Sequence, residues 1–166
     1  MGMAMKLADY LRAHPVQFDL LTHSHTGNSL QSAEAMHLPP RCLAKAVVLE
    51  DEKARMVMAV LPASCKLQLD ELRSRTGRML RLATEAELQA RFDDCAPGAV
   101  PPIGTAYGME TILDDSLMTL PEVYFEAGDH QTLVRVKTRD FVGLLEGASH
   151  MPFSAPMGGA GSRPLF

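Results

Sequence analysis

The sequence predicts one mixed α/β domain in which strands pair as hairpins instead of alternating regularly with helices. Its length of 166 residues suits a single domain, and a content of 46% hydrophobic and 22% charged residues is typical of a globular core. Helical and strand patterns both occur, and several strand patterns follow one another directly. We expect the folded domain to cover residues 1–150 and a flexible tail, rich in glycine and proline, to cover 151–166.

The first part of the chain predicts a helix, a strand and a second helix. Apolar residues at helical spacing predict a helix over about 3–14, which Pro15 ends. A short strand is expected over 16–21. After a polar loop, Asn28 can cap a helix that runs to about Leu38, where two prolines stop it.

The middle of the chain predicts a hairpin followed by a short helix. Two apolar runs, 44–49 and 55–61, flank a charged segment and are expected to pair as strands. A helix is expected over 70–76, with Gly77 as its C-terminal cap, and a short strand over 79–82.

A capping box opens the next helix, and an unusual loop follows it. Thr84 and Glu87 have the spacing of a capping box. Residues 95–108 then contain three prolines and three glycines, which excludes a regular helix or a central strand there.

The last part of the domain predicts strands followed by a helix. Strands are expected over 109–113, 123–127 and 132–136, with a turn between the last two. Thr138 can cap a final helix.

Charge and composition exclude several classes of function. The net charge of −4 argues against a basic coat protein for nucleic acid, and no apolar run is long enough to span a membrane. The three cysteines, Cys42, Cys65 and Cys95, form no C-x-x-C pair, which suits a reducing cytoplasm and predicts small buried side chains. The common phosphate-loop, dinucleotide, zinc-protease and serine-hydrolase motifs do not occur.

Three features of the sequence could still carry chemistry. Lys45 stands at the mouth of an apolar strand, where it either holds an anionic ligand or snorkels to the surface. The loop 98–104 either aims backbone N–H groups at a carbonyl or is a structural crossover. The segment 126–130 either supplies an acid–base histidine, His130, or is an ordinary Gly-Asp turn.

Two further groups of residues allow only weak predictions. His23, His25 and His37 have no firm partner pattern, so we expect no metal site. Four arginines between residues 73 and 81 form either a patch for tRNA phosphates or a solvated surface: Arg73, Arg75, Arg78 and Arg81.

Three segments, in this order, resemble the YbaK/ProX-type family of aminoacyl-tRNA deacylases. These proteins are free-standing relatives of the editing domain in bacterial prolyl-tRNA synthetases. The segments are 43–49, 97–104 and 124–130, with support from 28–30 and 82–88. No single motif is specific, but their order and spacing together are.

The resemblance covers about residues 5–147 and implies a fold, a reaction and partners. The family fold is a mixed, mainly antiparallel sheet that is curved or barrel-like and flanked by helices. The reaction is hydrolysis of the ester that joins a wrong amino acid to tRNA, with no cofactor and no metal. The implied partner is the acceptor end of aminoacyl-tRNA, and we expect neither DNA nor a membrane as a partner. Since the net charge of −4 predicts weak general affinity for tRNA, our hypothesis is that a synthetase or elongation factor is a second partner.

The resemblance also implies the site residues. Lys45 matches the family lysine that engages the terminal nucleotide, and the resemblance gives four residues a catalytic role: Lys45, Gly98, Gly104 and His130. A second set is expected to bind the substrate: Ala46, Ala99, Val100, Pro101, Pro102, Ile103, Gly128 and Asp129.

Specificity is expected to come from steric exclusion in the aminoacyl pocket, with Ala99, Val100 and Ile103 as its walls. Ala46 and Ile103 differ from the pattern of the alanyl-specific members, so alanyl, cysteinyl, seryl and threonyl esters all stay open. Two rival functions also remain: a non-catalytic module that binds an aminoacyl-adenosine-like ligand or a synthetase, and a hydrolase of small esters.

Overall fold

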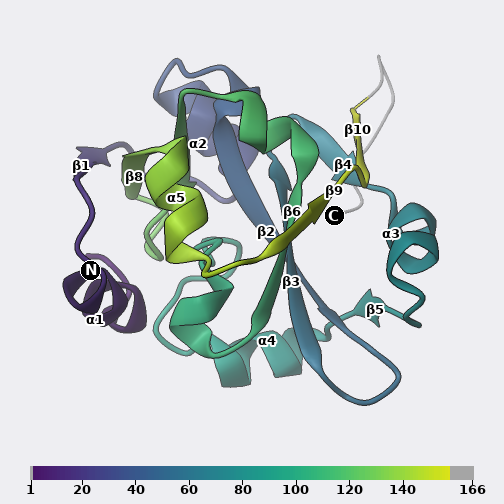
Figure 1. The fold of residues 1–166 in the computed structure, drawn as a ribbon. Coiled ribbons are helices and arrows are strands. Elements are labelled where there is room, and N and C mark those ends of the chain that lie inside the picture. The colour runs from purple at the N-terminus through teal and green to yellow at the C-terminus, as the bar shows by residue number, and fades with distance from the viewer. Residues whose placement is uncertain (1, 158–166) are drawn as a thin grey trace.

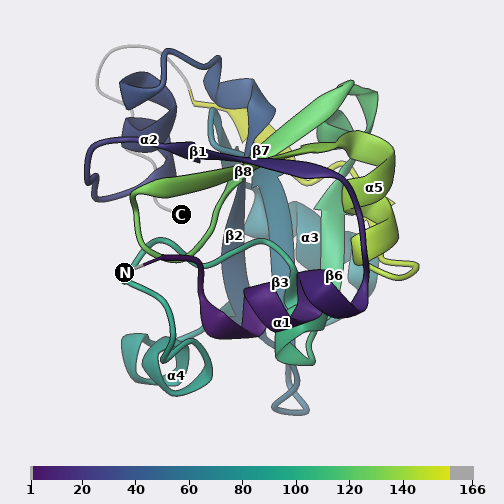
Figure 2. The same cartoon turned by 90° about the vertical axis from the view of Figure 1, so that its left-hand side faces the viewer.

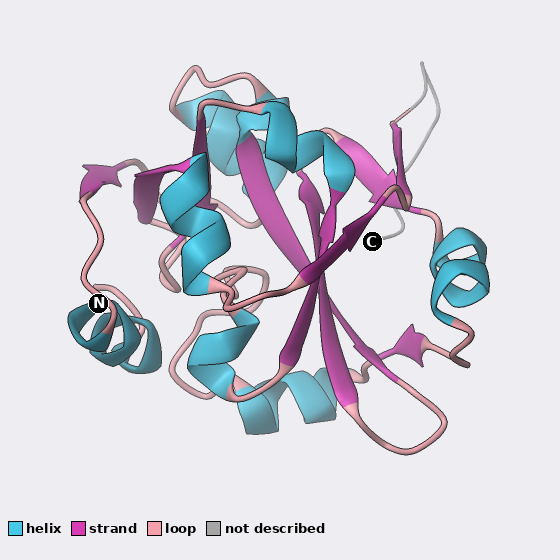
Figure 3. Cartoon of the chain, viewed as in Figure 1, coloured by secondary structure: helices cyan, strands magenta, loops and turns pink. Residues whose placement is uncertain are grey.

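Helices and strands interleave along the chain in this computed structural model, which describes residues 2–157 (Figures 1 and 3). The helices are α1 (Met5–Ala13), α2 (Ser29–Ala35), α3 (Leu69–Thr76), α4 (Glu85–Arg91) and α5 (Thr138–Leu144). The strands of the main sheet are β1 (Phe18–Thr22), β2 (Leu43–Glu50), β3 (Met56–Pro62), β5 (Arg81–Leu82), β6 (Glu110–Asp114), β7 (Glu122–Glu126), β8 (Thr132–Lys137) and β9 (Ser149–Met151). Two further strands, β4 (Cys65–Leu67) and β10 (Ser154–Pro156), pair separately, and three short 3-10 helices are η1 (Pro40–Cys42), η2 (Gly104–Tyr107) and η3 (Asp115–Thr119).

The main sheet has eight strands in the order β1-β8-β7-β2-β3-β6-β9, with β5 paired to β2 beside this path. The pairs β1/β8, β8/β7, β2/β3 and β2/β5 are antiparallel. The pairs β2/β7, β3/β6 and β6/β9 are parallel. The mixed, mainly antiparallel sheet flanked by helices confirms the predicted fold class, and among the described strands the sheet is open at β1 and β9.

One edge of β2 carries two different neighbours, and this arrangement creates a fork in the sheet. Leu43 and Ala44 pair with β7, whereas Leu49 and Glu50 pair with β5. The opposite edge of β2 pairs with β3 along its length, as the predicted hairpin requires. No described strand pairs with residues 45–48 on the forked edge.

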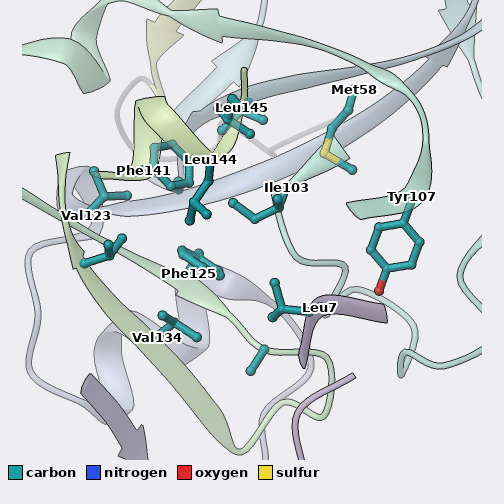
Figure 4. Close-up of a cluster of buried hydrophobic side chains, with 14 of the residues drawn as sticks. Leu7, Met58, Ile103, Tyr107, Val123, Phe125, Val134, Phe141, Leu144 and Leu145 are labelled. Atoms are coloured by element: carbon teal, nitrogen blue, oxygen red, sulfur yellow. The ribbon is translucent and has the colours of Figure 1, made fainter. Parts of the chain in front are cut away.

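Two hydrophobic clusters cover opposite faces of the central strands. Figure 4 shows the larger cluster, in which Leu7 of α1, Phe125 of β7 and Phe141 of α5 are fully buried. The second cluster contains Leu72 of α3. Figures 1 and 2 show α1 and α5 on one side of the sheet and α3 on the other. Residues of β3 alternate between the clusters, which explains its continuous apolar run.

The predicted helix ends are confirmed at three places. The side chain of Asn28 accepts a hydrogen bond from the backbone N–H of Gln31 at 2.9 Å. Thr84 and Glu87 form both hydrogen bonds of the capping box. Gly77 ends α3 in the left-handed conformation with φ +67°.

The expected start of the tail at Met151 is too early. β9 and β10 are regular strands, and Phe153 between them is fully buried in the second cluster. The backbone N–H of Phe153 also donates to Asp114 Oδ1 at 2.9 Å. A single large aromatic residue therefore anchors a segment whose prolines indicated irregular structure. The rest of the expected tail, 158–166, lies outside the described residues.

Three smaller expectations were also wrong. Thr138 does not cap α5, because the N-cap is Lys137 and the Thr138 hydroxyl has no hydrogen-bond partner among the described residues. The short strand expected over 79–82 is limited to Arg81–Leu82, because only these two residues pair with β2. The three cysteines are only half-buried. Burial nevertheless raises the pKa of the Cys95 thiol to about 12, so this residue stays protonated and unreactive near neutral pH.

Candidate functional site

A cavity of about 500 Å³ lies along the open edge of β2. This volume is typical of small-molecule sites. Its walls come from six parts of the chain: the start of α2, residues 45–48 of β2, Ala63 directly after β3, the region of β5 and α4, the proline-glycine loop, and Met157 after β10. The lining residues are Asn28, Ser29, Leu30, Lys45, Ala46, Val47, Val48, Ala63, Leu82, Ala83, Glu85, Leu88, Gly98, Val100 and Met157.

Lys45 contributes the cation of this cavity. The residue is half-buried on β2, opposite Leu61 of β3. Burial lowers the pKa of its ammonium below the ordinary value of 10.5, and the Coulombic interaction with Cys65 opposes this shift. A half-buried cation in a largely apolar cavity gains most from an anionic ligand that enters beside it.

The main chain of Ala46 faces the same gap. The carbonyl of Val48 accepts a hydrogen bond from the N–H of Ala83 at 3.0 Å on this edge of β2. Main-chain groups of residues two apart in a strand point in the same direction. The N–H and C=O of Ala46 therefore point into the cavity, where a ligand can meet one donor and one acceptor.

Gly98 forms the opposite rim of the cavity. It adopts φ +80°, a conformation that other residues rarely take. A Cβ at this position would lie 3.0 Å from the carbonyl oxygen of Gly27 and 3.3 Å from His130 Nε2. Only glycine therefore fits between the loop that precedes α2 and the imidazole of His130.

Most of the other residues of the proline-glycine loop are buried and do not line the cavity. Of the expected wall residues, Val100 lines the cavity, whereas Ala99 and Ile103 are fully buried. Ile103 packs in the larger hydrophobic cluster. Pro101 and Pro102 are also buried.

Gly104 starts η2, away from the cavity lining. An added Cβ there would collide with Thr111 Oγ1 and approach the carbonyl oxygen of Met109 to 3.0 Å. Close packing alone thus accounts for a glycine at this position.

The Gly128–His130 turn lies directly behind the Gly98 rim. Gly128 has φ +120°, and a Cβ there would lie 2.8 Å from Cβ of Ala4. Asp129 is buried and accepts hydrogen bonds from the backbone N–H groups of Gln131 and Thr132 at 2.9 and 2.8 Å. The turn expected at Gly-Asp is confirmed, and its side chains support the cavity from behind instead of lining it.

His130 is the link between this turn and the loop. It is 2% exposed, and its Nε2 donates to the carbonyl oxygen of Pro97 at 2.5 Å. The residue that the sequence predicted as catalytic therefore lies behind the rim and holds the residue before Gly98.

The expected arginine patch is neutralised by carboxylates. Each arginine forms at least one ion pair within the domain: Arg73 with Asp70, Arg75 with Glu71, Arg78 with Asp51 and Glu110, and Arg81 with Glu50 and Glu87. This pairing favours the interpretation of a solvated, charge-balanced surface over a strong phosphate patch.

The described part of the chain shows no arrangement suited to a metal ion or to a bilayer. Within residues 2–157, no group of three or more histidine, cysteine or acidic side chains could hold a metal. No described helix combines the length and apolar character needed to cross a membrane.

Sequence reasoning missed several residues of the site. Asn28, Ser29 and Leu30 form one rim, and their position after a polar loop and at a helix start was the available signal. Glu126 does not line the cavity, but it is fully buried at the end of an apolar strand, where a lone carboxylate was a signal as well. Met157 could not be found, because the segment before it carried no periodic pattern.

Comparison with known proteins identifies a family and several structural neighbours. The sequence model of the aminoacyl-tRNA editing domain matches residues 23–144. No curated protein matches the chain significantly.

Three solved structures share the fold. A protein described as a candidate trans-editing enzyme for prolyl-tRNA synthetase is 23% identical with TM-score 0.79, covering 92% of this chain and 96% of that one. The hypothetical protein APE2540 is 20% identical with TM-score 0.80, covering 90% of this chain and 99% of that one. A candidate signal transduction protein from Marinobacter aquaeolei VT8 is 19% identical with TM-score 0.77, covering 94% of this chain but only 32% of that longer chain.

Proposed function

Because the chain belongs to the aminoacyl-tRNA editing domain family, we propose that it is a deacylase that hydrolyses the ester between a wrong amino acid and the terminal ribose of tRNA. The observation that carries this proposal is the cavity at the fork of β2. It combines one cation, Lys45, with the main chain of Ala46 and the glycine rim at Gly98.

An aminoacyl ester is already activated, so this reaction needs positioning more than a strong protein nucleophile. Water must be held near the carbonyl carbon, and donors must meet the oxygen as negative charge develops on it. In the proposed arrangement, Lys45 engages the phosphate of the terminal nucleotide. The backbone at Ala46 and Gly98 receives the acyl group, and the free ribose hydroxyl of the substrate helps to activate water.

His130 acts in this proposal as a positioning residue. Its imidazole is buried behind the loop and bonds to Pro97, so it is placed to fix the rim and not to touch the ester. A Ser-His-Asp set is not required, because the free ribose hydroxyl of the substrate helps to activate the attacking water within a rigid frame, and the esterified ribose oxygen leaves.

The walls of the cavity indicate a small or moderately sized amino acid. Leu30, Leu88 and Val100 contribute branched apolar side chains, and Ala46, Ala63 and Ala83 leave space between them. A side chain too large for this space is excluded sterically, which is the principle of a second sieve.

Recognition of tRNA should be limited to its acceptor end. The protein has net charge −4, and the four arginines near α3 are paired with carboxylates. Few phosphate contacts imply weak overall affinity. We therefore extend the proposal to a second partner, a synthetase or elongation factor, that presents the mischarged tRNA in the cytoplasm.

A deacylation panel tests the proposal. Purified protein is mixed with tRNAs carrying labelled alanine, cysteine, serine, threonine or proline, and release of the amino acid is followed. We expect hydrolysis of at least one mischarged tRNA, its loss in Lys45→Ala, and its retention in the control Lys66→Ala, because Lys66 is exposed on β4. Equal rates on charged tRNA and on free amino-acid esters would instead indicate a hydrolase of small esters.

A further inference from the structure

A buried polar cluster lies behind the cavity and joins its two rims. It contains His23, Ser32 of α2, Glu126 at the end of β7, and His130 in the following turn. Glu126 is 1% exposed and His130 is 2% exposed, and His23 and Ser32 are also buried. Burial of so many polar groups is stable only when donors and acceptors are matched.

The cluster connects to each rim by a hydrogen bond. Ser32 lies on the helix whose first residues form one rim, and its hydroxyl donates to Glu126 Oε1. His130 donates from Nε2 to the carbonyl oxygen of Pro97, directly before Gly98 on the other rim. Glu126 and His130 are thus placed to set the distance between the rims.

Each of the two histidines uses one ring N–H group to donate a hydrogen bond to a backbone carbonyl. A carbonyl oxygen can only accept, so His130 Nε2 must carry a proton for Pro97. His23 Nδ1 must likewise donate to the carbonyl oxygen of Ser24 at 2.6 Å. In neutral imidazoles, the other nitrogen of each ring is then an acceptor.

Three buried acceptors remain without a donor among the described residues: His23 Nε2, His130 Nδ1 and Glu126 Oε2. His130 Nδ1 lies 3.8 Å from Glu126 Oε1, too far for a hydrogen bond but close enough for an ion pair when the ring is protonated. An acceptor left unpaired in a buried site costs about 1–3 kcal/mol. One additional proton on the Glu126 carboxyl would turn one of these acceptors into a donor and so reduce the mismatch.

The groups that face Glu126 favour that proton. Burial raises the pKa of the Glu126 carboxyl, and the negative charge of nearby Asp129 raises it further. The Ser32 hydrogen bond and His23 act in the opposite direction. The ring of His25 contacts His130 edge-on, with 5.8 Å between centroids, and closes the remaining side.

We propose that Glu126 is a positioning residue of the editing site, and that it holds the two rims through one proton shared with the imidazole of His130. This inference rests on the proposed function. Loss of the proton leaves Glu126 and Asp129 as two buried negative charges, which repel and loosen the rims. The raised pKa of Glu126 means that the stabilising contribution is present at low pH and is lost as pH rises through the folded-state pKa.

The variant Glu126→Gln tests the shared proton directly. Glutamine has the shape of the protonated acid. Its amide oxygen can accept from Ser32 and its amide N–H can donate to an imidazole, but the amide does not lose a proton between acidic and alkaline pH. At pH 6, we expect the kcat/KM of this variant to stay within about threefold of wild type. As pH rises, wild-type kcat/KM should fall when Glu126 loses its proton, and the variant should not show this fall. Lys45 also loses its proton as pH rises, but it does so in both proteins. The difference between their pH–activity profiles therefore measures the contribution of Glu126 alone.

Two further variants serve as controls for Glu126→Gln. Glu126→Ala removes both hydrogen-bonding oxygens, and we expect a loss of at least about tenfold in kcat/KM at every pH. Glu122→Gln makes the same chemical change four residues earlier on β7, where the carboxylate contacts Tyr124 and Arg135 at the surface, and we expect no change in the profile.

An NMR titration provides a readout independent of turnover. In wild type, the amide resonance of Gly98 should shift as pH rises from 5.5 to 9 and Glu126 loses its proton, and in Glu126→Gln this shift should vanish. The same pH-dependent shift of Gly98 in both proteins would overturn the inference, as would identical pH–activity profiles. If no tRNA is deacylated, the proposed function fails, whereas the titration still decides whether a shared proton holds the rims.

Discussion

Replacing Gly98 by alanine tests whether the loop rim is the working edge of the cavity. The residue has φ +80°, and alanine in a left-handed conformation costs about 1–2 kcal/mol. The new Cβ would also lie 3.0 Å from the Gly27 carbonyl oxygen and 3.3 Å from His130 Nε2, so the two rims must separate by a few tenths of an ångström. For a protein of this size, the strain corresponds to a fall in Tm of about 2–8 °C.

The effect on activity should exceed the effect on stability. Small displacements of a positioned acyl group cost up to about 100-fold in rate, so we expect kcat/KM to fall by about 10- to 100-fold in Gly98→Ala. Gly77→Ala is the matched control, because Gly77 has φ +67° and no atom within 4 Å of an added Cβ. Deacylation kinetics and thermal unfolding are measured on both variants. A Gly98→Ala protein with full activity and the Tm of Gly77→Ala would refute the role of this rim.

Four further changes test other parts of the account. Lys45→Ala should lower kcat/KM by about 100-fold or more, and wild-type activity should fall as pH rises through a lysine pKa below 10.5, since the ammonium is the active form; a stopped deacylation assay across pH checks both. Thr84→Ala removes a capping box and should cost about 1 kcal/mol, seen as a Tm lowered by about 2–4 °C. Phe153→Ala should cost about 3–5 kcal/mol in urea unfolding, and a wild-type-like midpoint would return the domain boundary to residue 150. Arg75→Gln should leave KM for charged tRNA within about twofold, because Glu71 already neutralises this arginine, whereas a larger rise would restore the phosphate-patch interpretation.

Local sequence signals identified most elements of the fold. Asn28, Thr84 and Gly77 mark helix ends through hydrogen bonds or backbone conformations that depend on a few neighbouring residues. The alternation along β3 was hidden, because a strand buried on both faces is apolar throughout. Phe153 was missed for a related reason: its burial depends on a distant strand, β4, and not on local periodicity.

The site was only partly predictable, because its geometry also depends on contacts between segments that are far apart in the sequence. The resemblance pointed to Lys45, Ala46 and Gly98, and these residues do meet in one cavity. The fork that creates the cavity is a property of strand order and register, which no local pattern encodes. Loop residues such as Ile103 looked equivalent to Val100 in the sequence, yet Ile103 points into the core.

Locating a bound substrate analogue tests the central claim most directly. The probe is an aminoacyl-adenosine in which an amide replaces the ester, carrying the amino acid that the panel identifies, or alanine if none is hydrolysed. A crystal structure of its complex should show the acyl carbonyl between the backbone of Ala46 and Gly98, with the nucleotide beside Lys45. An analogue bound elsewhere, with the fork of β2 still empty, would contradict the account.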